Sequence, residues 1–111
     1  MKKYLLIGMI GFSGLIGRGQ NLIQNGSFEQ YTSCPTSHSQ IDSALFWMNP
    51  STGTTLTGSP DYYNQCAPNA NYSVPSNSYT YQIAHNGFAY AGGYMTMLAM
   101  LSDVREYLEA P

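Results

Sequence analysis

The chain has 111 residues, of which 9% are charged, and its formal net charge is −2. After residue 19, a single arginine stands against all six carboxylates of the chain. A protein with so few bases cannot neutralise a row of phosphates, so nucleic-acid binding is nearly excluded. A polybasic contact with a membrane surface is excluded for the same reason. The length leaves room for one small domain.

The N-terminal residues have the pattern of a secretory signal peptide. Two lysines form a short positive region, and thirteen mostly apolar residues follow at 4–16. Small residues then precede a predicted cleavage site before Gln20. Thirteen residues are too few to cross about 30 Å of hydrocarbon, which makes a retained membrane anchor the weaker alternative. We therefore expect a signal peptide at 1–19, a secreted domain at 20–111 without a transmembrane span, and a location at the cell surface or outer envelope.

The two cysteines fit an exported protein. Cys34 and Cys66 are the only pair, and an oxidising compartment favours joining them in a disulfide. Two buried free thiols are the alternative. Neither cysteine belongs to a CxxC pair, and the two histidines lie far apart in the sequence, which argues against a zinc site.

The middle of the chain predicts short strands. Five prolines fall between residues 35 and 75, a spacing that helices rarely survive, and the ten tyrosines favour pleated surfaces. We expect an all-β domain to about residue 93, with a loop at 67–78, turns at Asn25-Gly26 and Asn86-Gly87, and Trp47 in the core. The expected extended segments are 21–23, 28–31, 44–48, 61–63, 79–83 and 88–94.

The C-terminal part has two interpretations. Apolar side chains from Tyr94 to Leu108 fall on one helical face without a proline between them, which predicts a helix at 94–109. Tyr107 and Leu108 can equally begin a strand after a loop at 102–103. The pattern leaves both alternatives open.

Several motifs occur in an order that resembles a known family. They are NLIQNGSFE at 21–29, YTSCP at 31–35, Trp47, SPDYYNQC at 59–66, VPSN at 74–77, AHNGFAYAG at 84–92 and REYL at 105–108. The series, which spans nearly all of the mature chain, resembles the N-terminal carbohydrate-binding-module-like domains of secreted cell-surface proteins of Bacteroidota. In those proteins an OmpA-like domain or a sorting domain commonly follows.

This resemblance implies a galactose-binding-like jelly roll, a β-sandwich with more strands than can be placed here. In the family, the motif at 105–108 starts a central strand with further strands after it. We therefore expect the sandwich to be incomplete at its C-terminus and the sequence to be a piece of a longer protein. The Met-rich stretch at 95–101 departs from the polar strand and loop typical of the family.

The resemblance also implies a structural calcium ion. Related jelly rolls hold calcium with the acidic residue that ends the opening motif, which is Glu29 here, and with backbone carbonyls. A second acidic ligand usually comes from the last strand, which this sequence lacks. A solvated or turn-bonded surface carboxylate is the alternative role for Glu29.

Enzyme motifs are missing from the sequence. It contains no GxSxG, HExxH or glycine-rich phosphate loop after the leader, and a Cys–His pair is available in any chain with two of each residue. A glycosidase needs two carboxylates at a set separation. Three carboxylates could supply such a pair only through a geometry that the sequence does not define: Glu29, Asp61 and Glu106. We expect no enzymatic activity.

Exposed tyrosines are the best candidates for contact with a sugar. Flat aromatic faces pack against the apolar side of a pyranose ring. Tyr79 and Tyr81 share one face of an expected strand after a polar loop, and Tyr62 and Tyr63 are adjacent, so one of these two should face outward. We therefore expect ligand contacts from Tyr79, Tyr81 and Tyr62.

These observations together predict a secreted, non-catalytic cell-surface module that is carbohydrate-binding-like or adhesive. The alternative is a structural spacer or interaction domain of an envelope-anchored, OmpA-like protein with no glycan ligand. The expected partner is accordingly a glycan or an envelope protein. Fold analogy supports both interpretations equally, because a sandwich does not dictate function.

Overall fold

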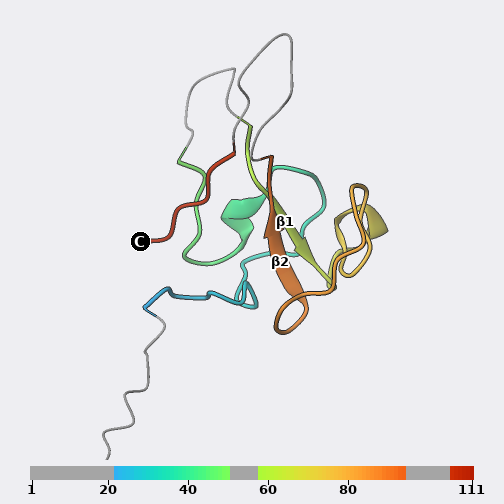
Figure 1. Cartoon of the computed structure of the whole chain (residues 1–111), viewed down its shortest axis with the longest axis horizontal. Helices are drawn as coiled ribbons and strands as arrows, with labels where there is room; N and C mark the ends of the chain where they lie inside the picture. Colours follow the sequence, from blue (N-terminus) through green and yellow to red (C-terminus); the bar gives the residue numbers. More distant parts are fainter. Residues whose placement is uncertain (1–21, 51–57, 95–105) are drawn as a thin grey trace, which may run out of the picture.

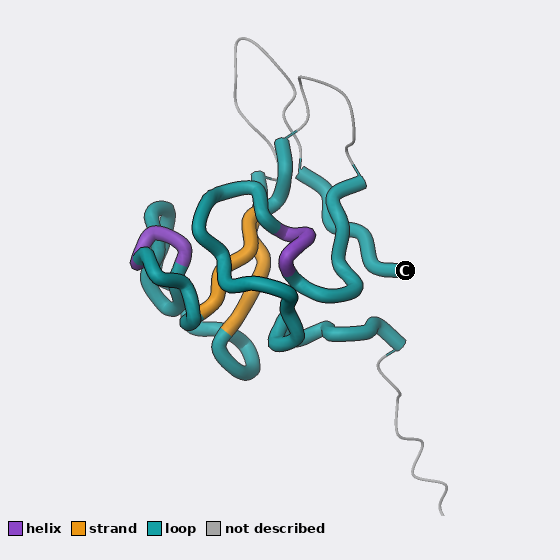
Figure 2. The backbone as a smooth tube through the Cα atoms, turned by 180° about the vertical axis from the view of Figure 1, so that it is seen from behind, coloured by secondary structure: helices purple, strands orange, loops and turns teal. Residues whose placement is uncertain are grey.

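The structure is a computed structural model of the chain, and it describes residues 22–50, 58–94 and 106–111. These residues form two strands, β1 (Asp61–Asn64) and β2 (Ala89–Gly92), and two short 3-10 helices, η1 (Ile41–Ser43) and η2 (Ala70–Tyr72). Figure 1 shows β1 and β2 side by side, and Figure 2 shows the same pair from behind, with η1 and η2 on opposite sides of it. The predicted signal peptide lies outside the described residues.

The two strands form an antiparallel pair. Asp61 lies opposite Gly92 and Asn64 lies opposite Ala89, and the bond from Gln65 N to Phe88 O, at 3.0 Å, extends the pairing by one step. The predicted strand at 61–63 and the predicted segment at 88–94 are thus confirmed in their central residues. The described part of the chain is a small domain with little helix and a two-stranded antiparallel sheet.

Tight turns lead into both halves of the domain as predicted. Asn25 has a φ of 52°, and Phe28 N donates to its carbonyl oxygen at 2.9 Å, which closes the turn at Asn25-Gly26. Gly87 has a φ of 72°, a left-handed conformation that favours glycine, immediately before β2. Asparagine and glycine tolerate these positive φ angles at little steric cost, so the local sequence is sufficient to predict both turns.

A small apolar core lies against the strand pair. Its buried members are Ile41, Ala44, Tyr62 and Ala89, and Phe28 and Trp47 pack against them. Trp47 is half-buried: its ring stacks on Phe28 with the centroids 4.6 Å apart, and its Nε1 donates to the carbonyl of Asn25 at 2.9 Å. Trp47 was predicted to lie in the core, and in the structure its ring packs against the core cluster and covers one side of it.

A disulfide ties the segment before η1 to the end of β1. Cys34 and Cys66 are bonded, with their Cα atoms 5.6 Å apart, which confirms the predicted pairing and rules out free thiols. The bond closes a separation of 32 residues. In the chain-entropy account, such a loop stabilises the fold by about 3 to 4 kcal/mol. The disulfide therefore supplements a core that is small.

The expectation that one of Tyr62 and Tyr63 faces outward is wrong. Tyr62 is 1% exposed and Tyr63 is 3% exposed, because β1 is covered on both of its faces. Tyr62 packs in the apolar core, whereas Tyr63 packs against Tyr90 with the ring centroids 5.3 Å apart. Alternation predicts an outward side chain only for a strand with one solvated face, and β1 has none.

Three other predicted segments pair only at single positions. Isolated bridges join Tyr31 to Ala44, Met48 to Glu109 and Ser76 to Tyr81. Within 44–48, Phe46 has a φ of 68°, which turns the chain and prevents a continuous strand. The jelly-roll sandwich is therefore not confirmed, and it remains a proposal for the protein.

Most of the alternative helix at 94–109 lies outside the described residues. Its described C-terminal end is extended rather than helical, because Met48 N donates to Glu109 O at 2.9 Å and Glu109 N donates to Met48 O at 3.1 Å. This pairing agrees with the strand-like alternative for that end of the chain. Across the described ranges, the structure contains no helix with the length and apolarity that a membrane crossing requires.

Candidate functional site

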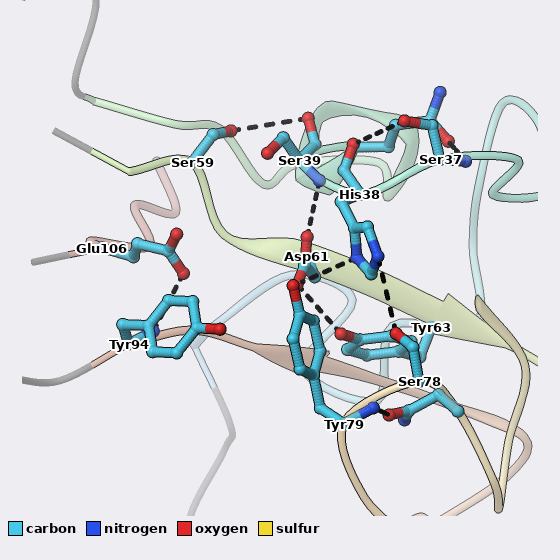
Figure 3. A network of polar contacts seen from close by, with 12 residues as sticks. Ser37, His38, Ser39, Ser59, Asp61, Tyr63, Ser78, Tyr79, Tyr94 and Glu106 are labelled. Atoms are coloured by element: carbon cyan, nitrogen blue, oxygen red, sulfur yellow. Dashed lines mark hydrogen bonds and ion pairs between the residues drawn. The ribbon is translucent and has the colours of Figure 1, made fainter. Parts of the chain in front are cut away.

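The most organised polar group of the structure surrounds Asp61, the first residue of β1. The residue is only 7% exposed, and its side chain accepts hydrogen bonds from Ser39 N at 2.6 Å and from the Tyr63 hydroxyl at 2.9 Å. Ser39 has a φ of 62°, so the chain bends sharply where its N–H turns toward the carboxylate. Figure 3 shows these groups meeting at Asp61. The carboxylate thus links β1 to the segment that precedes η1.

His38 lies behind this carboxylate. Its Nδ1 is 3.6 Å from Asp61 Oδ2, and its ring contacts the Tyr72 ring edge-on at 4.9 Å and the Tyr79 ring at 5.0 Å. The Nε2 atom is 3.5 Å from Ser78 Oγ (Figure 3). The imidazole therefore connects Asp61 to the loop that carries Tyr79, and it forms an ion pair with Asp61 when protonated.

An open cavity of about 350 Å³ lies on the other side of Asp61. Four tyrosines form its aromatic walls, and two carboxylates and an amide supply polar groups. The lining residues are Asp61, Tyr63, Asn77, Tyr79, Thr80, Tyr90, Gly92, Gly93, Tyr94 and Glu106. We call this site the tyrosine cavity. It brings together β1, β2, the loop after η2 and the described C-terminal segment.

The rim and the base of the tyrosine cavity differ in exposure. Tyr79 is 57% exposed and Tyr94 is 42% exposed, and their rings meet edge to face with centroids 6.0 Å apart. Tyr63 and Tyr90 form the base, where the Tyr90 hydroxyl accepts a bond of 2.6 Å from Asn77 Nδ2. The rim therefore offers accessible aromatic faces above a base whose hydroxyl groups are already ordered.

Burial changes the acidity of several of these tyrosines. Desolvation, reinforced by the hydrogen bond to Asp61, raises the pKa of Tyr63, and desolvation also raises the pKa of Tyr90. A hydrogen bond with Tyr94 is the main reason that the pKa of Tyr79 is raised. All of these hydroxyls are therefore protonated at neutral pH, and that of Tyr63 donates its proton to the Asp61 carboxylate.

Glu106 closes the opposite side of the tyrosine cavity. Its Oε2 accepts a bond of 2.9 Å from Tyr94 N, and its own N–H donates to Tyr94 O at 3.0 Å. A Cβ added at Gly58 would overlap the Glu106 side chain, and one added at Gly93 would lie 3.1 Å from its Oε2. Two glycines thus leave the space that this carboxylate fills. Burial, with a smaller contribution from the charge of Asp61, raises the pKa of Glu106.

The structure separates the three tyrosines that the sequence singled out. Tyr79 lies at the rim of the tyrosine cavity, as a ligand-binding residue requires. Tyr81 is 68% exposed, but it pairs with Ser76 and does not line that cavity. Tyr62 is buried: its hydroxyl donates to Phe28 O at 2.9 Å and accepts from Asn64 Nδ2 at 2.7 Å. Its ring is enclosed in the core and cannot stack on a ligand, so its assignment as a contact residue is corrected.

Glu29 lies in a different place. Its Oε1 accepts a hydrogen bond of 2.7 Å from Phe88 N, beside the turn at Gly87. It also lines a separate, shallow hollow of about 400 Å³ with Asn64 and Gln65 among its neighbours. Within the described ranges, no three histidine, cysteine, aspartate or glutamate side chains gather as a metal site would require. Calcium at Glu29 therefore remains a prediction, with backbone carbonyls and amide oxygens as its remaining ligands.

The sequence did not predict that the carboxylates of Asp61 and Glu106 line the same cavity. Of the three acidic residues considered as a possible pair, the structure brings Asp61 and Glu106 to one cavity and leaves Glu29 outside it. His38, Tyr90 and Tyr94 were also missed. No local pattern connects these residues, because they come from segments far apart in the chain. The motif order at 59–66, 84–92 and 105–108 was the only available signal, since each of these motifs contributes to the site.

His38 lies between Ser78 and Asp61, so the three side chains stand in the order nucleophile, base and orienting acid that a catalytic triad has. Its distances of 3.5 and 3.6 Å are longer than the hydrogen bonds of a working triad. The backbone N–H groups around the serine are also occupied: Ser78 N donates to Asn71 O, while the N–H groups of residues 79 and 80 both donate to Asn77 Oδ1. The N–H groups of residues 78 to 80 are therefore not free to stabilise an oxyanion.

Comparisons with known proteins add no assignment. No protein-family model matches the chain, and neither the curated proteins nor the solved structures include a significant match.

Proposed function

We propose that the chain is a non-catalytic carbohydrate-binding module of a secreted cell-surface protein and that the tyrosine cavity is its binding site. The observation that carries the proposal is the exposed ring of Tyr79, which stands at the rim of a cavity that also contains carboxylate and amide groups. An aromatic face packs against the apolar side of a sugar ring, while the carboxylates and the amide bond its hydroxyl groups.

The proposed location rests on three sequence features and one structural one. The signal-peptide pattern at 1–19, the motif order and the polar composition all favour an exported protein. The disulfide is consistent with an oxidising compartment. The jelly-roll family, with an OmpA-like or sorting domain elsewhere in the whole protein, belongs to this proposal.

The test compares two exposed tyrosines of the same loop. Binding of the full chain to a glycan array is measured for the parent, for Tyr79→Ala and for Tyr81→Ala. Truncation of a central aromatic anchor typically costs more than about 1 kcal/mol, so Tyr79→Ala should weaken binding about fivefold or more. Tyr81→Ala is the matched control and should bind like the parent, because Tyr81 lies outside the cavity. Equal effects of the two variants would refute the assignment of the site.

A second candidate function is an interaction domain that binds an envelope protein and no glycan. The observation that favours it is the exposure of Ile83 and Phe88, at 66% and 60%, on segments that do not line the tyrosine cavity. Absence of glycan binding, together with a stable complex with one envelope protein that Phe88→Ser disrupts, would favour this alternative.

A further inference from the structure

The tyrosine cavity contains more acidic groups than the binding of a neutral sugar requires. Asp61 and Glu106 both line it, and the described part of the chain contains no lysine or arginine that could compensate them. The one nearby group that can become cationic is His38, which lies on the far side of Asp61 and is not part of the lining. Among the described residues that line it, the cavity therefore presents two carboxylates and no lysine or arginine.

The two carboxylates are not equivalent. Asp61 is satisfied by Ser39 N and by the Tyr63 hydroxyl, which makes it a fixed part of the wall. Glu106 receives one bond, to its Oε2 from Tyr94 N, among the contacts described for it. Burial and the neighbouring Asp61 both disfavour its ionised form, as its raised pKa indicates. A cation placed between the two carboxylates would relieve both effects.

The aromatic walls favour the same kind of ligand. The faces of tyrosine rings are electronegative and attract cations that lie within about 6 Å of the ring centre. Tyr79 and Tyr94 meet at the rim with centroids 6.0 Å apart, and Tyr63 and Tyr90 meet at the base with centroids 5.3 Å apart. Several aromatic rings gathered around one space are the usual composition of a site for a quaternary ammonium ion.

We infer that the tyrosine cavity selects a glycan that carries a free ammonium group, an amino sugar, over neutral, N-acetylated or acidic sugars. This inference rests on the proposed carbohydrate function and adds the class of sugar. The ammonium group lies between Glu106 and Asp61, and the pyranose ring packs on Tyr79. Acidic sugars are rejected because a third negative charge in the cavity would be repelled by the two carboxylates.

The experiment uses oligomers of equal length and equal linkage that differ in one substituent. Binding of the full chain to glucosamine, N-acetylglucosamine and glucose oligomers is measured by calorimetry at neutral pH, with tetramethylammonium as a competitor. The glucosamine oligomer should bind about tenfold more tightly than the other two, and tetramethylammonium should displace it. Glu106→Gln should abolish this preference.

Glu109→Gln is the matched control. It removes the same charge from the same C-terminal segment at an exposed residue outside the cavity, so it should keep the preference. Equal losses in both variants would reduce the effect to general attraction between a cationic polymer and an acidic protein, and they would overturn the inference. Because the Glu106→Gln substitution can also lower the stability of the fold, the competition by tetramethylammonium on the parent chain serves as a separate test, and failure to compete would also overturn the inference.

The remaining outcomes separate the inference from the proposed function. If all three oligomers bind equally and Tyr79→Ala abolishes binding, the carbohydrate function stands and the selection of an amino sugar is wrong. If tetramethylammonium binds at Tyr79 and no oligomer does, the site recognises a cation and the carbohydrate function is wrong. If none of these probes binds, the inference is overturned, whereas the carbohydrate function is decided by the glycan array.

Discussion

Replacement of Asp61 tests the structural basis of the tyrosine cavity. Asp61→Ala removes the acceptor of two hydrogen bonds, one from Ser39 N at 2.6 Å and one from the hydroxyl of buried Tyr63 at 2.9 Å. Hydrogen bonds to a charged group contribute about 1.5 to 3 kcal/mol each. Water can replace the acceptor for Ser39, which is exposed, but not for Tyr63. We therefore expect a loss of about 3 kcal/mol in the free energy of unfolding.

The assay is urea unfolding followed by the fluorescence of Trp47. With a slope of about 1.5 kcal/mol per molar, the expected loss moves the midpoint down by about 2 M. Asp42→Ala is the matched control, because Asp42 is exposed and accepts one bond of 3.1 Å from Asn49 N. It should cost about 1 kcal/mol or less. Asp61→Asn, which keeps one acceptor oxygen, should fall between the two.

The result that refutes this reasoning is a midpoint for Asp61→Ala that equals the midpoint for Asp42→Ala. Such a result would mean that the buried carboxylate does not hold β1 to the segment before η1. The cavity would then lack the fixed wall that both proposals assume.

Two further predictions concern the stability of the fold. Reduction of the Cys34–Cys66 bond should lower the free energy of unfolding by about 3 to 4 kcal/mol, measured as the shift of the urea midpoint with a reducing agent, and an unchanged midpoint would contradict the account. Burial raises the pKa of Tyr62 to about 12. The native state therefore keeps a proton that the unfolded state releases near pH 10, so its stability is full below pH 10 and falls by about 3 kcal/mol as the pH rises toward 12. Tyr62→Phe should reduce this loss in unfolding experiments across that pH range, and an identical pH dependence would show that Tyr62 is not the group responsible.

Local signals were enough to predict part of the fold. The turns at Asn25-Gly26 and Asn86-Gly87 follow from residues that tolerate positive φ, and the strand near 61–63 follows from its β-forming tyrosines. The disulfide followed from a single cysteine pair in a chain with a predicted export signal. Each of these features depends on a few neighbouring residues or on composition, so no tertiary information was needed.

The predictions from the sequence were wrong where tertiary packing determines the local structure. Tyr62 was predicted to contact a ligand, but the structure buries it because both faces of β1 are covered. The apolar segment 44–48 was expected to be a strand, and the turn at Phe46 limits it to single bridges. No periodic pattern in the sequence indicates that both faces of β1 are covered or that the chain turns at Phe46.

The candidate site could be predicted only in part for the same reason. Tyr79 was identified from its exposed position after a polar loop, a local property. Asp61 and Glu106 were recognised as acidic residues. Their place in one cavity, however, depends on the packing of the Glu106 side chain against Gly58 and Gly93. Because the two acidic residues lie far apart in the sequence, no local pattern indicates that they line the same cavity.

The most direct measurement of the central claim is a crystal structure of the full chain with a glucosamine oligomer bound. The account predicts one sugar ring packed on Tyr79, with its ammonium nitrogen within hydrogen-bond distance of the Glu106 carboxylate. An oligomer bound elsewhere, for example in the hollow beside Glu29, or bound in the tyrosine cavity with its ammonium group turned to solvent, would contradict it.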